Sequence, residues 1–156
     1  MSGVIIRPES PLSADLALLM GRHSADMHSA DAPPESMHML DAGALAGPGI
    51  DFFVMREGDR PIGMGALKRI DARHAEIKSM HVLAELRGRG LARAMLDHLI
   101  AEARMAGYQR LSLETGAQAV FLAARELYTR AGFKECPPFE GYKPDPHSVF
   151  MTRELG

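Results

Sequence analysis

The sequence lacks tryptophan altogether and contains a single cysteine, Cys136. One cysteine excludes a disulfide within the chain, and no adjacent histidine could activate its thiolate, so we interpret Cys136 as a half-buried residue at a strand end. No apolar run approaches the ~20 residues that a membrane-spanning helix needs. The start of the chain also lacks the apolar stretch of a signal peptide. These absences predict a cytoplasmic protein with no membrane partner.

An excess of positive charge is missing as well. The formal net charge is −2 and the isoelectric point is near 6.4. Such a chain has few cations with which to release counterions from a nucleic acid, so we expect no nucleic-acid partner and a small ligand instead. What the chain does have is apolar residues, 46% of the 156. That content suffices for the core of one domain spanning 1–156.

Turn-forming residues and apolar periodicity predict alternating strands and helices. Ser10 followed by Pro11 is typical of a helix start, because a capping hydroxyl precedes a proline in the first turn. Helical spacing then places Leu12, Leu16 and Leu19 on one buried stripe. Glycines at 107 and 132 are expected to end two later helices. The expected elements are a strand at 4–6, a helix from 10, a short helix at 37–45, a hairpin of strands 51–56 and 62–70, a strand at 75–83, a helix at 90–106, a strand at 110–114, a helix with the stripe Val120, Ala124, Leu127 and Ala131, and strands at 133–136 and 147–153.

The segment 76–96, EIKSMHVLAELRGRGLARAML, carries the clearest chemical signal. It joins a strand, a turn with glycines at 88 and 90, and an amphipathic helix. Glycines allow successive backbone N–H groups to point inward, and the helix N-terminus behind them adds about half a positive charge. This combination predicts a binding site for a pyrophosphate.

The same loop could also be interpreted as a nucleotide-binding motif or as a simple turn. A nucleotide P-loop ends in Gly-Lys-Ser or Gly-Lys-Thr, whereas this chain has Gly90-Leu91-Ala92. A dinucleotide-binding fingerprint needs a third glycine at position 93, which is Arg93. A glycine-rich turn that merely starts a helix remains as an alternative on the loop alone.

Two motifs resemble one known family. Arg87-Gly88-Arg89-Gly90-Leu91-Ala92 is similar to the Arg/Gln-x-x-Gly-x-Gly/Ala signature of the GNAT (GCN5-related) N-acetyltransferases. The run from Leu127 to Phe133, LYTRAGF, resembles that family's Leu-Tyr-x-x-x-Gly-Phe. The resemblance implies a mixed α/β (α+β) fold. It would have a mostly antiparallel sheet of about six or seven strands, about four flanking helices, and fourth and fifth strands that splay apart.

The resemblance also implies acetyl-CoA as cosubstrate. Its pantetheine arm is expected between the strands 75–83 and 110–114, paired with the backbone of Met80, His81 and Val82, where one N–H would act as an oxyanion donor. The pyrophosphate is expected on the loop from Arg87 to Ala92. The cofactor-binding residues so implied are Met80, His81, Val82, Arg87, Gly88, Arg89, Gly90, Leu91 and Ala92.

Aminolysis of a thioester needs a base, because an ammonium has no lone pair. Glu76 stands eleven residues before Arg87, where several members of the family carry a base, so it is the candidate base, acting directly or through a water. The alternative is a surface carboxylate paired with a neighbouring cation, and Lys78 is either that partner or a group that binds the acceptor. Strand alternation places Glu76, Lys78, Met80 and Val82 on one face and His81 on the other.

Further candidates surround the expected cleft. Glu114, at the end of the fifth strand, is a second candidate base or an acceptor-binding residue. His38 lies in a flap before the hairpin and is a candidate acceptor contact. Tyr128 matches the family's tyrosine that protonates the leaving thiolate, while the alternative is a packing role for its ring. Tyr142, in the proline-rich loop near the end, is interpreted as a surface residue, and no metal site is expected.

The sequence therefore predicts an N-acetyltransferase that moves an acetyl group from acetyl-CoA directly to a primary amine. The acceptor, a small molecule or a peptide amine, cannot be read from the residues, and a homodimer is left open. Two alternatives remain: a non-catalytic acyl-CoA-binding or regulatory module of the same fold, and a protein-interaction domain in which the loop is only a turn.

Overall fold

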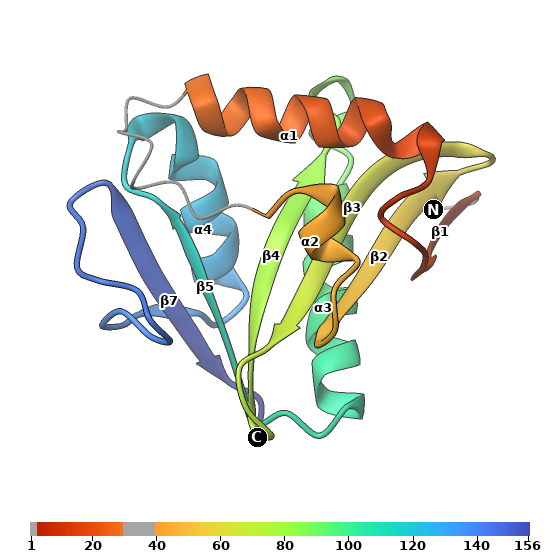
Figure 1. The fold of residues 1–156 in the computed structure, drawn as a ribbon. Coiled ribbons are helices and arrows are strands. Elements are labelled where there is room, and N and C mark those ends of the chain that lie inside the picture. The colour runs from red at the N-terminus through yellow and green to blue at the C-terminus, as the bar shows by residue number, and fades with distance from the viewer. Residues whose placement is uncertain (1–2, 30–39) are drawn as a thin grey trace.

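A seven-stranded mixed sheet forms the centre of the computed structural model, which describes residues 3–29 and 40–156 (Figure 1). The strand order is β1-β2-β3-β4-β5-β7-β6, in which only β4 and β5 are parallel. This confirms the predicted mixed α/β class and the mostly antiparallel sheet. The strands are β1 (Val4–Pro8), β2 (Ile50–Glu57), β3 (Arg60–Arg69), β4 (His74–Val82), β5 (Arg110–Gly116), β6 (Lys134–Glu135) and β7 (Ser148–Glu154).

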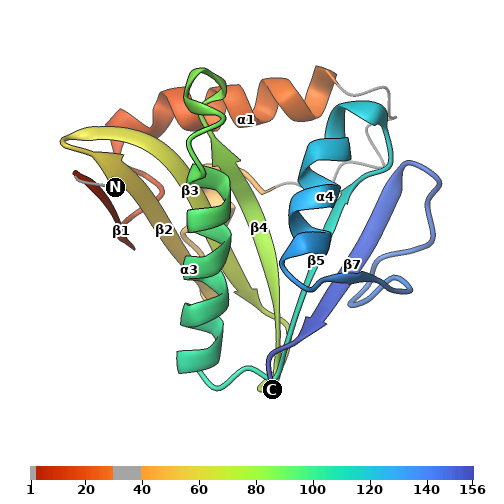
Figure 2. The same ribbon diagram turned by 180° about the vertical axis from the view of Figure 1, so that it is seen from behind.

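Helices cover both faces of the sheet. In the described ranges they are α1 (Ala17–Ser29), α2 (Ala42–Leu45), α3 (Leu91–Met105) and α4 (Leu122–Arg130). Helices α1 and α2 lie on one face, and α3 and α4 lie on the other (Figures 1 and 2). Apolar side chains from the sheet and from α1 and α3 form one buried cluster between these layers. No helix in the described part of the chain is both long and apolar enough to cross a bilayer.

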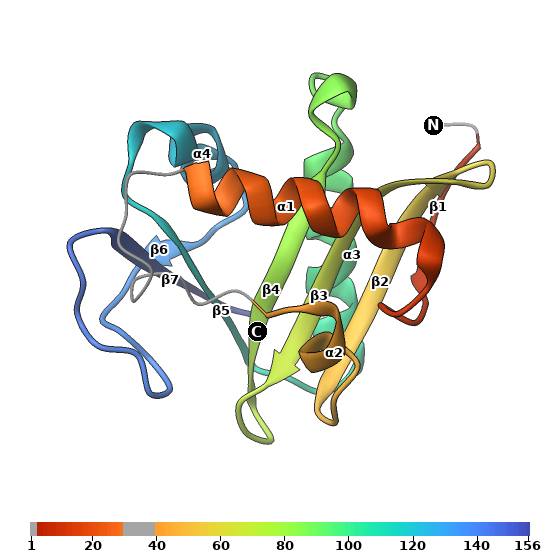
Figure 3. The same cartoon turned by 45° about the horizontal axis from the view of Figure 1, so that its top comes forward.

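Strands β4 and β5 diverge along their length. They pair over only three positions, from His74↔Arg110 to Glu76↔Ser112, after which β5 continues alongside β7. The two strands diverge from this point like the arms of a V (Figure 1). Helix α1 crosses above the wide end of the V (Figure 3). The predicted splay is therefore confirmed, and beyond Glu76 it leaves one edge of β4 without a partner among the described strands.

Glycines fix the position and both ends of α3. A Cβ on Gly65 of β3 would lie 3.0 Å from Leu99 Cδ1, so the missing side chain lets this helix approach the sheet closely. Gly90, with φ of 76°, is the N-cap residue, and Gly107, with φ of 89°, directly follows the C-cap residue. Both are left-handed conformations that glycine adopts without steric cost. The predicted start and end of this helix are confirmed.

Two predicted details of the helices are wrong. The first helix does not begin at Pro11, because the Ser10 hydroxyl accepts a hydrogen bond from Leu12 N (3.2 Å) and closes a turn instead. A 3₁₀ turn (Ala14–Leu16) and α1 follow, so Leu12 is 63% exposed. In the last helix, Val120 lies in a 3₁₀ turn ahead of α4 and is 66% exposed, whereas Tyr128 is the buried residue.

Strand β4 carries a bulge at Ser79. Lys78 and His81 of β4 lie opposite Ala66 and Met64 of β3, so the pairing includes one extra residue in β4. Ser79 has φ of 53°, a left-handed conformation that is uncommon for residues other than glycine. An extra residue shifts the alternation of side chains along a strand. The bulge thus changes which residues of β4 share a face.

Candidate active site

Glu76 lies where β4 and β5 separate, and its side chain is fully buried. Its Oε2 accepts a hydrogen bond from the Tyr142 hydroxyl (2.7 Å) and lies 3.1 Å from Lys78 Nζ. Its Oε1 is buried and has no hydrogen-bond partner among the residues that the structure describes. The interpretation of Glu76 as a surface carboxylate is therefore wrong. A buried acceptor without a donor costs free energy unless a ligand supplies one, so this oxygen points to a ligand position.

Lys78 and Tyr142 complete a buried cluster around this carboxylate. Lys78 is 7% exposed, donates to the Tyr142 hydroxyl and lies 5.1 Å from the centre of the Tyr142 ring. Burial and then the negative charge of Glu76 raise the pKa of Tyr142 far above that of a free tyrosine. The prediction that Tyr142 is a surface residue is not fulfilled, because its hydroxyl faces the interior. The pairing of Lys78 with Glu76, one of the two predicted options, is observed.

His81 lies on the face that the sequence did not predict. The bulge at Ser79 turns its side chain to the same face as Lys78, where its ring lies 5.4 Å from that of His23 on α1. Its Nδ1 lies 3.8 Å from Asp26 Oδ2, and its buried Nε2 has no hydrogen-bond partner. Burial, followed by the charge of His81, lowers the pKa of His23 to about 4, and burial lowers the pKa of His81. Both rings are therefore neutral at pH 7.

The loop before α3 presents backbone and cations to the outside. Gly88 (φ 86°) and Gly90 (φ 76°) are exposed, and a Cβ at either position would meet no atom within 4 Å. Arg87 lies 3.7 Å from Asp26, and Arg89 forms a bidentate pair with Glu57 at 2.6 and 3.3 Å. Leu91 is buried and anchors the first turn of α3. The loop thus combines an open glycine turn, a helix N-terminus and two arginines, which suits an anionic group.

Tyr128 faces inward from α4. Its side chain is 8% exposed and its ring packs edge-on against Phe133 at 6.0 Å. Burial raises the pKa of Tyr128 to about 12, so the phenol is protonated at neutral pH. Its hydroxyl forms no hydrogen bond within the described part of the chain, and its orientation toward a cleft stays a prediction. A packing role and a role as proton donor are both compatible with this position.

The remaining candidates lie on β5, at the end of β4 and at the start of α3, and one lies outside the described part of the chain. Glu114 of β5 is half-buried and accepts a hydrogen bond from Ser148 Oγ (2.7 Å) on β7. His38 falls outside the described residues. Met80 is partly buried and Val82 is buried at the end of β4, and Ala92 packs partly buried on α3. In residues 3–29 and 40–156, no group of three or more His, Cys, Asp or Glu could hold a metal ion.

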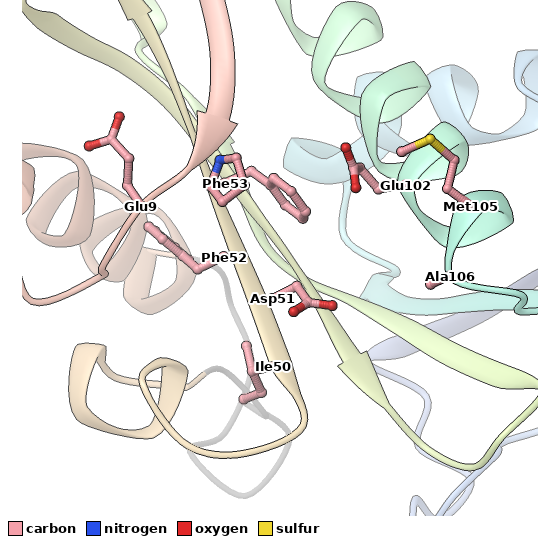
Figure 4. A pocket seen from close by; sticks show the side chains of 9 residues that line it. Glu9, Ile50, Asp51, Phe52, Phe53, Glu102, Met105 and Ala106 are labelled. Carbon is pink, nitrogen blue, oxygen red and sulfur yellow. The ribbon is translucent and has the colours of Figure 1, made fainter.

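A hollow of about 650 Å³ lies elsewhere, between the start of β2 and the end of α3. Figure 4 shows Glu9, Asp51 and Glu102 around it, together with the exposed Met105. Glu9 is already bonded to Arg56 at 2.7 and 2.8 Å. None of the predicted site residues lines this hollow, so it is distinct from the candidate site at the splay.

The chain is similar in sequence to known acetyltransferases. Residues 19–133 match the acetyltransferase (GNAT) family. The chain belongs to the GNAT family. The uncharacterised N-acetyltransferase YsnE of Bacillus subtilis is 52% identical over 124 residues, which cover 80% of this chain and 82% of YsnE. The IAA acetyltransferase of Azospirillum brasilense is 39% identical over 99% of this chain and 100% of its own length.

Solved structures agree with this assignment. A protein of Klebsiella pneumoniae assigned as an acyl-CoA N-acyltransferase superposes with a TM-score of 0.80 at 28% identity, over 98% of each chain. Members of the GNAT family use acetyl-CoA, and this member is accordingly an acetyltransferase enzyme. The predicted family, fold and cofactor are confirmed.

One residue of the cluster escaped the sequence analysis. Tyr142 reaches Glu76 across 66 positions of sequence, from a loop without periodicity. A tyrosine among prolines is equally typical of an exposed turn, so no local signal distinguishes the two situations. His81 escaped for a related reason, since strict alternation conceals a bulge.

Proposed function

We propose that this GNAT enzyme transfers the acetyl group of acetyl-CoA directly to a primary amine, with Glu76 as the base. The observation that carries the proposal is the buried Oε1 of Glu76, which lies at the splay of β4 and β5 and has no donor in residues 3–29 and 40–156. An amine N–H placed there would supply the missing hydrogen bond and lie in position to lose its proton. The acceptor nitrogen therefore approaches from the side of α1.

In this proposal the acetyl-CoA cosubstrate lies in the gap between β4 and β5, on the side opposite to the acceptor amine. The loop from Arg87 to Ala92 holds the pyrophosphate through backbone N–H groups and the N-terminus of α3. The pantetheine arm fills the position of a strand beside β4, because β4 has no partner beyond Glu76 among the described strands. The bulge at Ser79 supports an N–H aimed at the thioester oxygen from the segment of Met80 to Val82.

The transfer itself then needs two proton movements. The amine nitrogen bonds to the thioester carbonyl carbon, and its proton passes to Glu76 directly or through a water. The negative charge on the carbonyl oxygen is held by the β4 backbone. When the tetrahedral intermediate collapses, the carbon–sulfur bond breaks and Tyr128 gives its proton to the leaving thiolate. No covalent enzyme intermediate is formed.

The acceptor is a small-molecule or peptide amine in this proposal. Glu76 and Glu114 favour a cationic amine, whereas Lys78 and the histidines favour an acidic one, so the charges alone select neither. The relative named IAA acetyltransferase makes IAA a compound to include in the assay beside the amines.

The test is thiol release from acetyl-CoA across a panel of amines, after thermal-shift measurements with acetyl-CoA and free CoA. With an acceptor in hand, Glu76→Gln should lower kcat by about 10²- to 10⁴-fold, the usual worth of a general base. The acetyl-CoA dissociation constant should stay close to wild type, because the base does not touch the cofactor.

Matched variants keep this test clear. Glu135→Gln changes a carboxylate exposed on β6 and should leave kcat unaltered. Glu76→Asp retains the negative charge that pairs with Lys78. Its shorter side chain moves the carboxylate away from the acceptor amine, so kcat should also fall. Full turnover in folded Glu76→Gln would assign the base to another group.

A further inference from the structure

The loop between β6 and β7 brings a phenol to the proposed base. Tyr142 donates to Glu76 Oε2 at 2.7 Å and accepts a hydrogen bond from Lys78 at the same time. Lys78 Nζ lies 3.1 Å from the same carboxylate oxygen. Two donors from different segments thus converge on one oxygen of Glu76, while the other oxygen has none within the described part of the chain.

The position of Tyr142 is fixed by its own surroundings. Its ring lies 5.4 Å from that of Phe139 and 5.6 Å from that of Phe150, and its backbone N–H donates to Phe139 O (3.1 Å). The loop is tied at both ends, by Cys136 N to Phe150 O (2.9 Å) and by Ala117 N to His147 O (3.0 Å). The hydroxyl therefore reaches Glu76 from an anchored loop.

A carboxylate needs such support to act in one orientation. The terminal torsion of a glutamate is broad, so the plane of its carboxylate can turn when no donor holds it. Donors to Oε2 from both Tyr142 and Lys78 stabilise one orientation of this plane and thereby fix the position of the second oxygen.

We propose that Tyr142 is a positioning residue of the acetyl transfer, whose hydroxyl holds Oε2 of Glu76 so that Oε1 faces the acceptor amine. This rests on the proposed role of Glu76 as base. Lys78 alone would hold this plane less firmly, because an ammonium is a compact point charge whose three N–H donors can rotate. Hydrogen bonds to charged groups are typically worth more than neutral ones, so the loss of this one should be measurable.

Other groups near the cluster do not make the same contact. His74, on the same face of β4, is bonded to Ser112 Oγ at 2.6 Å, and Lys68 lies opposite Glu76 on β3. Glu114 on β5 and Glu140 in the loop add negative charge, which together with burial and Glu76 raises the pKa of Tyr142. The phenol consequently stays protonated and remains a donor throughout the range of an activity assay.

The test compares Tyr142→Phe with wild type, using saturating acetyl-CoA and the best acceptor from the amine panel. The phenylalanine keeps the ring contacts with Phe139 and Phe150 and removes only the hydroxyl. We expect kcat to fall by about tenfold or more, from the loss of a hydrogen bond to a charged group. The acetyl-CoA dissociation constant should change by less than about twofold, because Tyr142 lies on the acceptor side. Tyr108→Phe is the control: it removes the hydroxyl of a residue outside the cluster, between α3 and β5, and should leave kcat unchanged.

A second readout needs no acceptor. In protein labelled with ¹³C at glutamate carboxyl groups, the Glu76 resonance is identified by its loss in Glu76→Gln. Removing the donor to Oε2 should move this resonance in Tyr142→Phe and not in Tyr108→Phe. A role of the ring in packing alone would leave it in place.

The inference requires both changes, so an unmoved Glu76 resonance or an unaltered kcat in folded Tyr142→Phe overturns it. Failure of the proposed function looks different, because Glu76→Gln itself would then turn over at the wild-type rate. If Tyr142→Phe turns over at the wild-type rate while Glu76→Gln is inactive, the positioning role of Tyr142 is wrong and the proposed function stands.

Discussion

Tyr128 has a polar group at the end of a buried ring. Its ring packs against Phe133 and the side chain is only 8% exposed, yet its hydroxyl has no partner in the described part of the chain. Buried tyrosine hydroxyls usually find a hydrogen-bond partner. A thiolate that leaves from acetyl-CoA would be such a partner in the proposed reaction.

Tyr128→Phe separates the two roles of this residue. The variant keeps the ring and its packing, so acetyl-CoA affinity should be retained. If the hydroxyl is the acid, kcat should fall by about 10²- to 10⁴-fold in a thiol-release assay. Tyr108→Phe serves as control. Retention of most of the turnover, with chemistry rate-limiting, would leave Tyr128 with its packing role and give the acid role to water or another group.

Helix α3 begins and ends at glycines with similar backbone conformations. Gly90 precedes its first turn with φ of 76°, and Gly107 follows its last with φ of 89°. Only Gly90 belongs to the loop that would hold the pyrophosphate. The helix therefore offers a matched pair of sites, equal in backbone strain and different in distance from the cofactor.

Gly90→Val should weaken acetyl-CoA binding by more than about tenfold, because a β-branched residue resists the left-handed conformation that shapes the anion site. Gly107→Val places the same strain at the other end of α3. It should lower the free energy of unfolding by about 1–2 kcal/mol without changing the dissociation constant. Calorimetric titration measures both affinities. Equal affinity in the two folded variants would contradict binding through this loop.

Strand β4 shows how one irregular residue organises an element. The extra residue at Ser79 places His81 on the face that holds Glu76 and Lys78. The same strand loses its neighbour β5 just beyond Glu76. A regular strand with a full partner would have neither a row of three ionisable side chains on one face nor an open edge for a cosubstrate.

Over the whole molecule, each of the three tyrosines lies in surroundings that disfavour the phenolate. Burial is the largest cause for all of them, raising the pKa of Tyr128 to about 12 and also raising the pKa of Tyr108 and of Tyr142. Because the chain has no tryptophan, its near-ultraviolet absorbance reports mainly on these side chains.

The protein should therefore lose stability in alkali. Between pH about 10 and 12, unfolded chains have lost the phenol proton while native Tyr128 keeps it, so the unfolded state binds fewer protons and the free energy of unfolding falls. Tyr128 alone should contribute about 3 kcal/mol to this fall. Denaturant unfolding at successive pH values measures it, and Tyr128→Phe should show a shallower decline. Phenolate absorbance that rises near pH 10 in the native protein would contradict the burial of these rings.

Much of the fold could be predicted because it depends on local signals. The hairpin of β2 and β3, the glycine ends of α3 and the order of the elements follow from turn residues and apolar periodicity. The glycine turn from Arg87 to Ala92 could be predicted because it lies in consecutive residues, and its binding of a pyrophosphate stays a prediction. The start of the first helix was missed because Ser10 closes a turn, which is the other conformation that a serine before proline supports.

The sequence by itself determined the family, the class of fold, the glycine turn before α3 and the strand that carries Glu76, since each of these depends on residues close together along the chain. Only the tertiary structure decided the burial of Glu76, the face of His81 and the contact between Glu76 and Tyr142. The physical reason is that these features arise from how distant segments lie against one another. A bulge of one residue in β4 and a loop anchored 66 positions away leave no periodic trace in the sequence, yet they place the groups that the proposed reaction requires.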